Sequence, residues 1–396
     1  MTQSTMTQRA MTQRALPDLY RPSHDELARQ RFVGLMKFHA NGALEQQLGE
    51  HYETALRPAF EQTHGHAPVN RDEARPLFEP DALYQHWGSM VYASQSFMWQ
   101  SVGETCQRIG ADFEARAQWL TERAARGEGA GGTLKLAPEL VIPEPIASTE
   151  IHRQPGGYFH EASPQDLHAA LIYFGTLELY RTAKGLTANA AVGEPGIGRF
   201  IGGVVRRRYP ELAPRRILDL GCGTGSETLG LKECFPQAEI HGLDLSAPFV
   251  RFAHAWAEEK GVAAHFRQAD ARQTGYPDGY FDLIVSHIVF HETWHDIAPA
   301  IFAEMRRILA PGGVFLNADV PYQPSRMPIT KQVTNDWQVR NNGEPFWTGF
   351  ADTDVRERLK QAGFTEAEIV AEYEPLGAGH YYFFGATTAE SQRKAA

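Results

Sequence analysis

The sequence contains few cysteines and no long apolar segment. Only three cysteines occur among its 396 residues, and none belongs to a Cys-x-x-Cys motif. This number is too small for a disulfide framework, so we expect a reducing, cytoplasmic location. No run of about 18 apolar residues is present, so no segment is expected to span a membrane.

Positive charge is also scarce. Lys and Arg number 38 against 48 Asp and Glu residues, which gives a net charge of −10. An acidic chain is a poor match for nucleic acid or anionic lipid, so we expect it to bind neither. The stretch from Met1 to Leu16 lacks the apolar core of a secretory signal. We expect residues 1–20 to form a disordered tail.

The first half of the chain carries the pattern of a helical domain. Ser23 and Glu26 are spaced as a capping box, which marks the start of a helix. Apolar residues at helical spacing predict further helices over residues 44–60, 81–109 and 112–126. We therefore predict a mainly α-helical N-terminal domain over residues 21–135.

Residues 136–210 are predicted to form a connector and helices that pack on the core. The segment 138–145 is rich in proline and should be extended. The following stretch, EIHRQPGGY, contains a Pro-Gly-Gly turn, and we expect it to close as a lid over the cofactor or the substrate. Its candidate substrate-binding residues are His152, Tyr158 and His160. The alternative is a plain connector whose glycines serve only the turn.

Two helices are expected in the second part of this connector. One covers residues 163–184, where Ser163 and Pro164 suit the N-cap and the first helical position. The other covers residues 198–208.

From Arg216 onward, short apolar strands alternate with helices. Strands are predicted over residues 217–220, 239–243, 264–268, 281–286, 313–318, 366–373 and 380–385. Such alternation predicts an α/β fold, with a doubly wound, mostly parallel, seven-stranded Rossmann-like sheet. We assign this domain to residues 211–390 and treat residues 321–350 as an insertion within it.

Residues suited to ligand binding follow the first three of these strands. The loop DLGCGTG, which begins at Asp219, allows close approach of backbone to a ligand and opens a helix N-terminus. The carboxylate of Asp219 would repel a pyrophosphate but suits a ligand that carries an ammonium group. Asp244 can accept both hydroxyls of a ribose, and Asp270 can accept from an adenine amine.

With these motifs, residues 211–320 resemble the class I S-adenosylmethionine-dependent methyltransferases. The matching segments are ILDLGCGTG, GLDLS, QADA, FDLIV and RRILAPGG, in this order. The resemblance implies S-adenosylmethionine as the cofactor and methyl transfer as the activity. The cofactor-binding residues that it implies are Asp219, Gly221, Gly223, Gly225, Asp244, Leu245, Asp270, Ala271 and Ser286.

The substrate is expected over the carboxyl end of the fourth strand, where the sequence reads SHIVFHETWHD. Methyl transfer from a sulfonium requires in-line positioning and, for a protonated nucleophile, removal of a proton. Histidine suits this task because its pKa of about 6.5 is close to working pH. We predict His291 as the base or substrate-binding group and Glu292 as its orienter or a second acid. The alternative is that both residues cap the next helix.

His287 and His295 are predicted to bind the substrate. Together with His291 they have the spacing of one helix face, and two of them would then be able to bind a metal. His287 belongs to the end of a strand, however, so no metal site is predicted. In the insertion, Arg326 and Arg340 are candidates to bind a carboxylate or phosphate, with a solvated loop as the alternative.

The sequence therefore predicts methyl transfer from S-adenosylmethionine to a small molecule. It does not decide whether the atom that receives the methyl group is O, N, S or C. Other functions stay open: an RNA or protein methyltransferase, a non-catalytic cofactor-binding or regulatory protein, a metal-assisted 2-oxo-acid C-methyltransferase, and a nicotinamide oxidoreductase. The acidic charge and the lack of an Asn-Pro-Pro-Tyr motif argue against the first of these. A homodimer through the N-terminal helical domain is expected, because helical additions of this kind often form dimers in this superfamily.

Overall fold

A computed structural model describes residues 15–184, 196–320, 327–376 and 379–389 of the chain. Its centre is a sheet of eight strands in the order β1-β4-β3-β2-β5-β6-β8-β7. The strands are β1 Thr133–Lys135, β2 Arg216–Leu220, β3 Glu239–Asp244, β4 His265–Gln268, β5 Phe281–His287, β6 Leu309–Asp319, β7 Ile369–Leu376 and β8 Gly379–Thr387. Neighbours from β1 to β6 are parallel, and β8 is antiparallel to both β6 and β7. The predicted doubly wound, mostly parallel fold is confirmed.

The short strand β1 was not predicted from the sequence. It lies within residues 21–135, which we expected to be a helical domain, and it pairs in parallel with β4 at the edge of the sheet. A strand of three residues is too short to show an alternating pattern. Its pairing with β4 means that the N-terminal part of the chain also contributes to the sheet.

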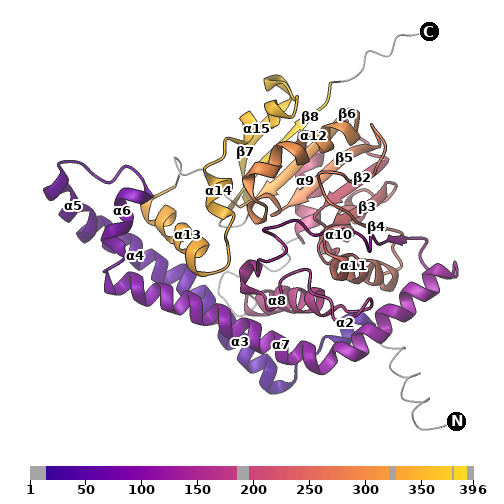
Figure 1. The fold of residues 1–396 in the computed structure, drawn as a ribbon, viewed down its shortest axis with the longest axis horizontal. Helices are drawn as coiled ribbons and strands as arrows, with labels where there is room; N and C mark the ends of the chain where they lie inside the picture. The colour runs from indigo at the N-terminus through magenta and orange to yellow at the C-terminus, as the bar shows by residue number, and fades with distance from the viewer. Residues whose placement is uncertain (1–14, 185–195, 321–326, 377–378, 390–396) are drawn as a thin grey trace.

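Helices cover both faces of the sheet (Figure 1). Successive residues of a strand point to opposite faces, and β6 shows this division. Phe315 packs into the core on one face, whereas Val314 and Leu316 pack into the core on the other. The helices of the first face are α12 (Ala298–Ile308) and α15 (Val355–Gln361), and those of the second are α9 (Ile197–Arg208), α10 (Ser226–Cys234) and α11 (Ala247–Glu259).

The described residues ahead of β1 are mainly helical, as predicted for residues 21–135. Their α-helices are α2 Leu16–Leu19, α3 His24–His39, α4 Glu45–His51, α5 Arg57–His64, α6 Arg71–Phe78 and α7 Ala82–Ala125. The expected disordered tail over residues 1–20 is wrong at its end, where Leu16–Leu19 form a helix because Leu16 and Leu19 are buried in the core. The predicted capping box at the start of α3 is confirmed. The Ser23 hydroxyl accepts from the N–H of Glu26 at 3.3 Å, and the Glu26 carboxylate accepts from the N–H of Ser23 at 2.7 Å. Across the described residues, every helix is too short or too polar to cross a membrane.

The two helices predicted over residues 81–109 and 112–126 are one helix, α7, of 44 residues. The predicted break at Gly110 is wrong. A glycine inside a helix costs about 1 kcal/mol, and the neighbouring Ile109 and Phe113 are buried, each contributing about 1.5–3 kcal/mol. Tertiary packing therefore carries the helix through the glycine.

Helix α7 joins the N-terminal helices to the sheet domain. It runs along one side of the molecule beneath α8 (His168–Lys184) and α11 (Figure 1). Phe113 of α7 stacks on Phe252 of α11, with ring centroids 5.2 Å apart. Arg116 also holds Glu259 of α11 through two hydrogen bonds of 2.8 and 2.9 Å. The two parts of the chain therefore share one buried core.

Helix α8 begins at His168, not at Ser163 as predicted. Residues 163–166 form a turn instead, in which the Asp166 N–H bonds to the Ser163 carbonyl. Asp166 accepts from the N–H groups of both Ala162 and His168, each at 2.7 Å. Because Asp166 accepts from backbone N–H groups on both sides of itself, it fixes the start of α8. The helix therefore begins later than the N-cap predicted at Ser163.

Candidate functional site

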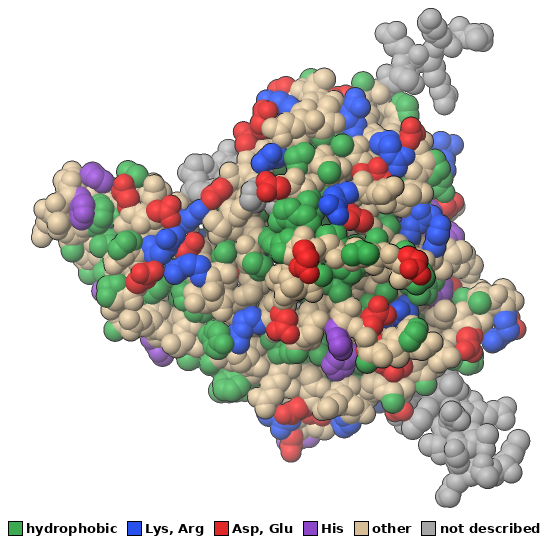
Figure 2. All heavy atoms as spheres, in the orientation of Figure 1, with side chains coloured by type: hydrophobic (Ala, Val, Ile, Leu, Met, Phe, Trp, Pro, Cys, Tyr) green, Lys and Arg blue, Asp and Glu red, His purple; other side chains and the backbone are tan. Residues whose placement is uncertain are grey.

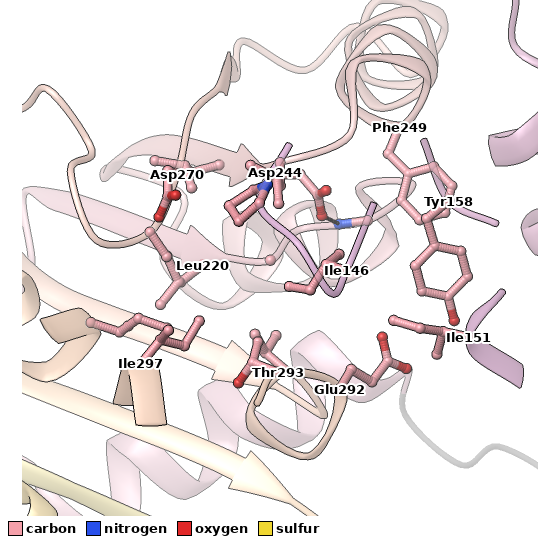
Figure 3. A pocket seen from close by; sticks show the side chains of 18 of the residues that line it. Ile146, Ile151, Tyr158, Leu220, Asp244, Phe249, Asp270, Glu292, Thr293 and Ile297 are labelled. Atoms are coloured by element: carbon pink, nitrogen blue, oxygen red, sulfur yellow. Dashed lines mark hydrogen bonds between the residues drawn. The ribbon is translucent and has the colours of Figure 1, made fainter. Parts of the chain in front are cut away.

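A cavity lies at the carboxyl ends of the central parallel strands. The chain runs from β2 outward to β3 and β4, and then returns to place β5 on the other side of β2. Doubly wound sheets bind ligands at such a reversal of strand order. The cavity has an empty volume of about 960 Å³, including its open mouth. Its wall is partly apolar, with side chains such as Leu220, Ile146 and Phe249 facing the space (Figure 3).

The glycine loop after β2 forms one side of this cavity. Gly221 and Gly223 line it, with φ values of 72° and 51°. A Cβ on Gly221 would lie 2.4 Å from the Val289 side chain, whereas a Cβ on Gly223 would have no neighbour closer than 4.0 Å. The loop therefore needs glycine at these positions, and its backbone at Gly223 faces open space.

The other predicted residues of this loop lie behind the cavity wall. Gly225 is the N-cap of α10 and packs against Ala253. Asp219 is fully buried, and its Oδ2 accepts from the Thr228 hydroxyl of α10 at 2.5 Å. Burial raises the pKa of Asp219. These two residues support the loop and do not line the cavity.

Asp244, at the end of β3, lines the cavity and anchors the glycine loop. Its Oδ2 accepts from the N–H of Gly223 at 3.0 Å, and its Oδ1 accepts from the N–H of Ser246 at 2.8 Å. Burial raises the pKa of Asp244 to about 6, against the lowering effect of these two hydrogen bonds. The predicted neighbour Leu245 also lines the cavity.

Asp270 and Ala271, beyond the end of β4, line the cavity. Asp270 lies on the far side of the cavity from Tyr158 (Figure 3). Arg272 holds the Asp270 carboxylate through contacts of 2.6 to 3.1 Å. Burial would raise the pKa of Asp270, but the hydrogen bonds from Arg272 outweigh it and lower the pKa. Asp270 is therefore an ionised acceptor at the cavity wall.

The residues after β5 contain the predicted catalytic pair. Glu292 lines the cavity, but the buried His291 does not. The His291 Nδ1 lies 2.6 Å from Oδ1 of the buried Asp319, and its Nε2 lies 4.0 Å from the Glu292 carboxylate. Burial would lower the pKa of His291, but Asp319 outweighs it and raises the pKa. The structure thus gives Glu292 access to a ligand and holds His291 behind it.

The other residues predicted on this segment are distributed around the end of β5. His287 lines the cavity, and burial lowers its pKa to about 4. Ser286 is buried behind the wall, where its hydroxyl lies 2.5 Å from the Asn317 side chain. His295 opens a 3-10 turn, His295–Ile297, so the three histidines do not share one helix. Among the described residues, no group of three or more His, Cys, Asp or Glu side chains is arranged to hold a metal ion.

The strap, which we define as residues 136–167 between β1 and α8, crosses the cavity. Five of its residues line the wall: Pro143, Ile146, Ile151, Tyr158 and Phe159. The Tyr158 hydroxyl is buried without a hydrogen bond to any described residue, and it lies on the same side of the cavity as the Glu292 carboxylate (Figure 3). The predicted His160 is exposed and does not line the cavity.

His152 fastens the strap to two other parts of the chain. Its Nε2 lies 2.8 Å from Oε1 of Glu292, and its Nδ1 lies 2.5 Å from Oε1 of Glu344. Burial alone would lower the pKa of His152, but the two carboxylates outweigh it and hold the pKa well above 6.5. The carbonyl of His152 accepts from Gln95 and Trp99 of α7, at 2.6 and 2.8 Å. We call His152, Glu292 and Glu344 the clasp.

The insertion is helical and contributes residues that were not predicted. It forms α13 (Ile329–Asn341) and α14 (Trp347–Ala351), and Glu344 of the clasp lies between these helices. Arg340 pairs with Asp336 at 2.9 Å and with Glu79 at 3.3 Å, away from the cavity wall. Arg326 lies outside the described residues.

The fold and this site together define the class of the domain. A doubly wound sheet, a glycine loop after β2 and an acid at the end of β3 are the features of a class I S-adenosylmethionine-dependent methyltransferase. Residues 217–313 match the family model described as a methyltransferase domain. The chain thus carries a methyltransferase domain of this class, and the resemblance seen in the sequence is confirmed.

Named relatives share this domain. The chain is 40% identical over 123 residues to a demethylmenaquinone methyltransferase of Thermus thermophilus, covering 30% of this chain and 55% of the relative. It is 30% identical over 164 residues to a malonyl-[acyl-carrier protein] O-methyltransferase of Halorhodospira halophila, covering 40% of this chain and 51% of the relative. The chain therefore spans about half the length of these relatives.

A solved structure shows a weaker likeness. Phosphoethanolamine N-methyltransferase 2 of Haemonchus contortus, in complex with S-adenosyl-L-methionine, is 15% identical with a TM-score of 0.37. The match covers 48% of this chain and 52% of that chain.

Proposed function

We propose that this protein transfers a methyl group from S-adenosylmethionine to a small-molecule acceptor. The observation that carries this proposal is the cavity at the reversal of strand order, with the open backbone of Gly223 and the carboxylate of Asp244 side by side in its wall. The space fits the cofactor, since it pairs an apolar wall with carboxylates at the ends of β3 and β4. When bound, S-adenosylmethionine supplies an electrophilic methyl group on a sulfonium.

The chain's own residues would bind and orient the reactants. Asp244 accepts from the ribose hydroxyls, and Asp270 with Ala271 borders the adenine. Gly221 and Gly223 border the methionine part. Such positioning is the main contribution that a protein makes to an in-line displacement.

We assign different roles to the two residues of the predicted catalytic pair. Glu292 faces the cavity, where its carboxylate can contact the acceptor or take its proton. His291 is a positioning residue, because its bond to Asp319 fixes the turn Phe290–Glu292 that carries Glu292. His287, Tyr158 and the clasp residue His152 complete the side of the site where we place the acceptor.

Calorimetric titration with S-adenosylhomocysteine tests the cofactor assignment. We expect one molecule to bind per chain, and we expect NADH to give no heat of binding. Tight binding of NADH without binding of S-adenosylhomocysteine would favour an oxidoreductase and contradict the proposal. Binding of S-adenosylhomocysteine with no methylation of any acceptor would favour the regulatory alternative.

A small-molecule acceptor is supported by the charge of the protein. The net charge is −10, and basic side chains alternate with acidic ones on the described part of the face in Figure 2. No continuous basic surface is visible there. The two named relatives act, by their names, on a quinone precursor and on a malonyl group carried by a protein, so an acceptor attached to a carrier protein is the second candidate.

We further propose a homodimer through the N-terminal helices. Phe32 and Leu35 of α3, and Phe97 of α7, are 66%, 42% and 47% exposed. Light scattering after gel filtration is expected to give twice the 44.2 kDa chain mass, and Phe32→Asp combined with Phe97→Asp is expected to give the monomer. A wild-type monomer at every concentration would refute this assembly.

A cytoplasmic location is also proposed, since all three cysteines are buried and unpaired.

A further inference from the structure

A second cavity lies between the N-terminal helices and the insertion. Residues of α3, α7 and α8 form one side of it, and residues of α13 and α14 form the other. Its empty volume is about 1060 Å³, including its open mouth. The side from α13 is polar, with Asn335 and Gln338, whereas Trp99 and Tyr180 supply aromatic surface on the opposite side. A space of this size and mixed character suits a small organic molecule.

This second cavity shares a wall with the cofactor cavity. Tyr173 and Ile288 line both spaces. The clasp lies between the two cavities, because Glu292 lines the cofactor cavity and its partner His152 lines the second cavity. Ile288 directly follows β5, so the second cavity lies at the strand end where the acceptor is expected.

Lys37 of α3 is a buried cation in this second cavity. It is only 4% exposed, and its Nζ donates to the side-chain oxygen of Gln95. The same Gln95 donates through its Nε2 to the carbonyl of His152, which fixes the amide with its oxygen toward Lys37. Among the described residues, no carboxylate forms a salt bridge with Lys37.

The acidic side chains around Lys37 are already paired. Glu344 lies at 2.5 Å from His152, and Glu45 lies at 2.7 Å from Lys331 and 2.6 Å from the Thr334 hydroxyl. Burial lowers the pKa of Lys37 to about 8, which leaves its charged form populated at neutral pH. The Lys37 Nζ also lies over the ring of Tyr180, 5.9 Å from its centroid. Burying an ammonium group that forms no salt bridge with a carboxylate is costly, and an anion entering the cavity would lower that cost.

We propose that the second cavity holds the acid end of the acceptor, an unsaturated or aromatic acid whose carboxylate pairs with Lys37 and whose reacting end lies at the wall that this cavity shares with the cofactor cavity. This inference rests on the proposed function and adds the chemical class of the acceptor. The body of the acid packs on Trp99 and Tyr180, and the polar residues of α13 bind its remaining oxygens.

The test uses matched pairs of ligands on the full chain with S-adenosylhomocysteine present. The probes are 4-hydroxybenzoate, 4-hydroxycinnamate and cis,cis-muconate monomethyl ester, each compared with its uncharged primary amide. Calorimetry is expected to show at least one acid binding tenfold or more tighter than its amide. No binding of any acid at 10 mM, while S-adenosylhomocysteine binds normally, would overturn this inference and leave the proposed function intact. Failure of S-adenosylhomocysteine to bind would instead contradict the proposed function.

Variants locate the site and separate binding from folding. Lys37→Met is expected to lose the preference for the acid by at least tenfold, and Lys37→Arg is expected to retain it. Lys135→Met is the control, because Lys135 is exposed on the edge strand β1 and does not line this cavity. An acid preference unchanged in Lys37→Met would overturn the assignment.

A thermal measurement distinguishes this role from a structural one. Removal of an unpaired buried charge should leave the melting temperature of Lys37→Met equal to that of the wild type or higher. Two results together would show that Lys37 serves the fold alone. The melting temperature of Lys37→Met would fall by more than about 4 °C, equivalent to roughly 1 kcal/mol or more. Acid binding would remain in both Lys37→Arg and Lys37→Met.

Discussion

Replacement of Asp244 by alanine is expected to weaken binding of S-adenosylhomocysteine by about 100-fold or more. The carboxylate holds the Gly223 and Ser246 N–H groups and faces the cavity where the ribose is expected. Hydrogen bonds to a charged group contribute about 1.5–3 kcal/mol each. The free energy of binding lost with two ribose contacts and the loop anchor therefore exceeds the roughly 2.7 kcal/mol that corresponds to a 100-fold change in affinity. Calorimetric titration measures this directly.

Asp282→Ala is the matched control for this variant. Asp282 also accepts from two backbone N–H groups, those of Arg215 and Arg216 at 2.8 and 2.9 Å. It lies at the start of β5, the end of the strand opposite the cavity. We expect it to lose stability but to bind the ligand as the wild type does. Equal affinities of Asp244→Ala and wild type would contradict the assigned role of Asp244.

His152→Gln is expected to lower the free energy of unfolding by about 2–3 kcal/mol, somewhat below the roughly 3–5 kcal/mol of a fully buried ion pair. The His152 side chain is 28% exposed, and its removal leaves Glu292 and Glu344 without their shared cation. Because Glu292 lines the cofactor cavity, turnover should fall at least tenfold as well. His160→Gln, on an exposed residue of the same strap, should change neither quantity.

The pH dependence of this effect has a definite sign. The pKa of His152 is higher in the folded protein than its ordinary 6.5. Its stabilising contribution is therefore complete below pH 6.5 and is lost as the pH rises through the folded pKa. Urea unfolding between pH 6 and 10 should show the gap between wild type and His152→Gln closing toward high pH. A constant or widening gap would mean that the imidazolium does not hold the clasp.

The cavity wall at the ends of β2, β3 and β4 was predictable because its signals are local in the sequence. The glycine loop and the acids Asp244 and Asp270 each directly follow a strand, and parallel strands bring their carboxyl ends together at one edge. Local patterns of apolar residues also predicted six of the eight strands to within three residues at each end. A local capping motif predicted the start of α3. The strand β1 was missed because its three residues have no pattern of their own and pair only through β4.

The part of the cavity wall around Glu292 was not predictable because it is assembled from distant segments. Glu292 and His152 are 140 positions apart in the chain, and Glu344 joins them from the insertion. Lys37 and Tyr173 lie on helices whose apolar patterns show burial but not which neighbours they meet. Arg340 was a reasonable candidate by residue type, yet Asp336 lies one turn before it on α13 and pairs with it. This i, i+4 spacing is a local signal that the sequence already carries, whereas the second partner of Arg340, Glu79, is brought to it only by tertiary packing.

The most direct test of this account is a crystal structure of the protein with S-adenosylhomocysteine. We predict the ligand in the cavity at the ends of β2, β3 and β4, with its ribose hydroxyls within hydrogen-bond distance of the Asp244 carboxylate and its sulfur on the side of Glu292. The account would be contradicted by a ligand bound elsewhere, or by a ribose that makes no contact with Asp244.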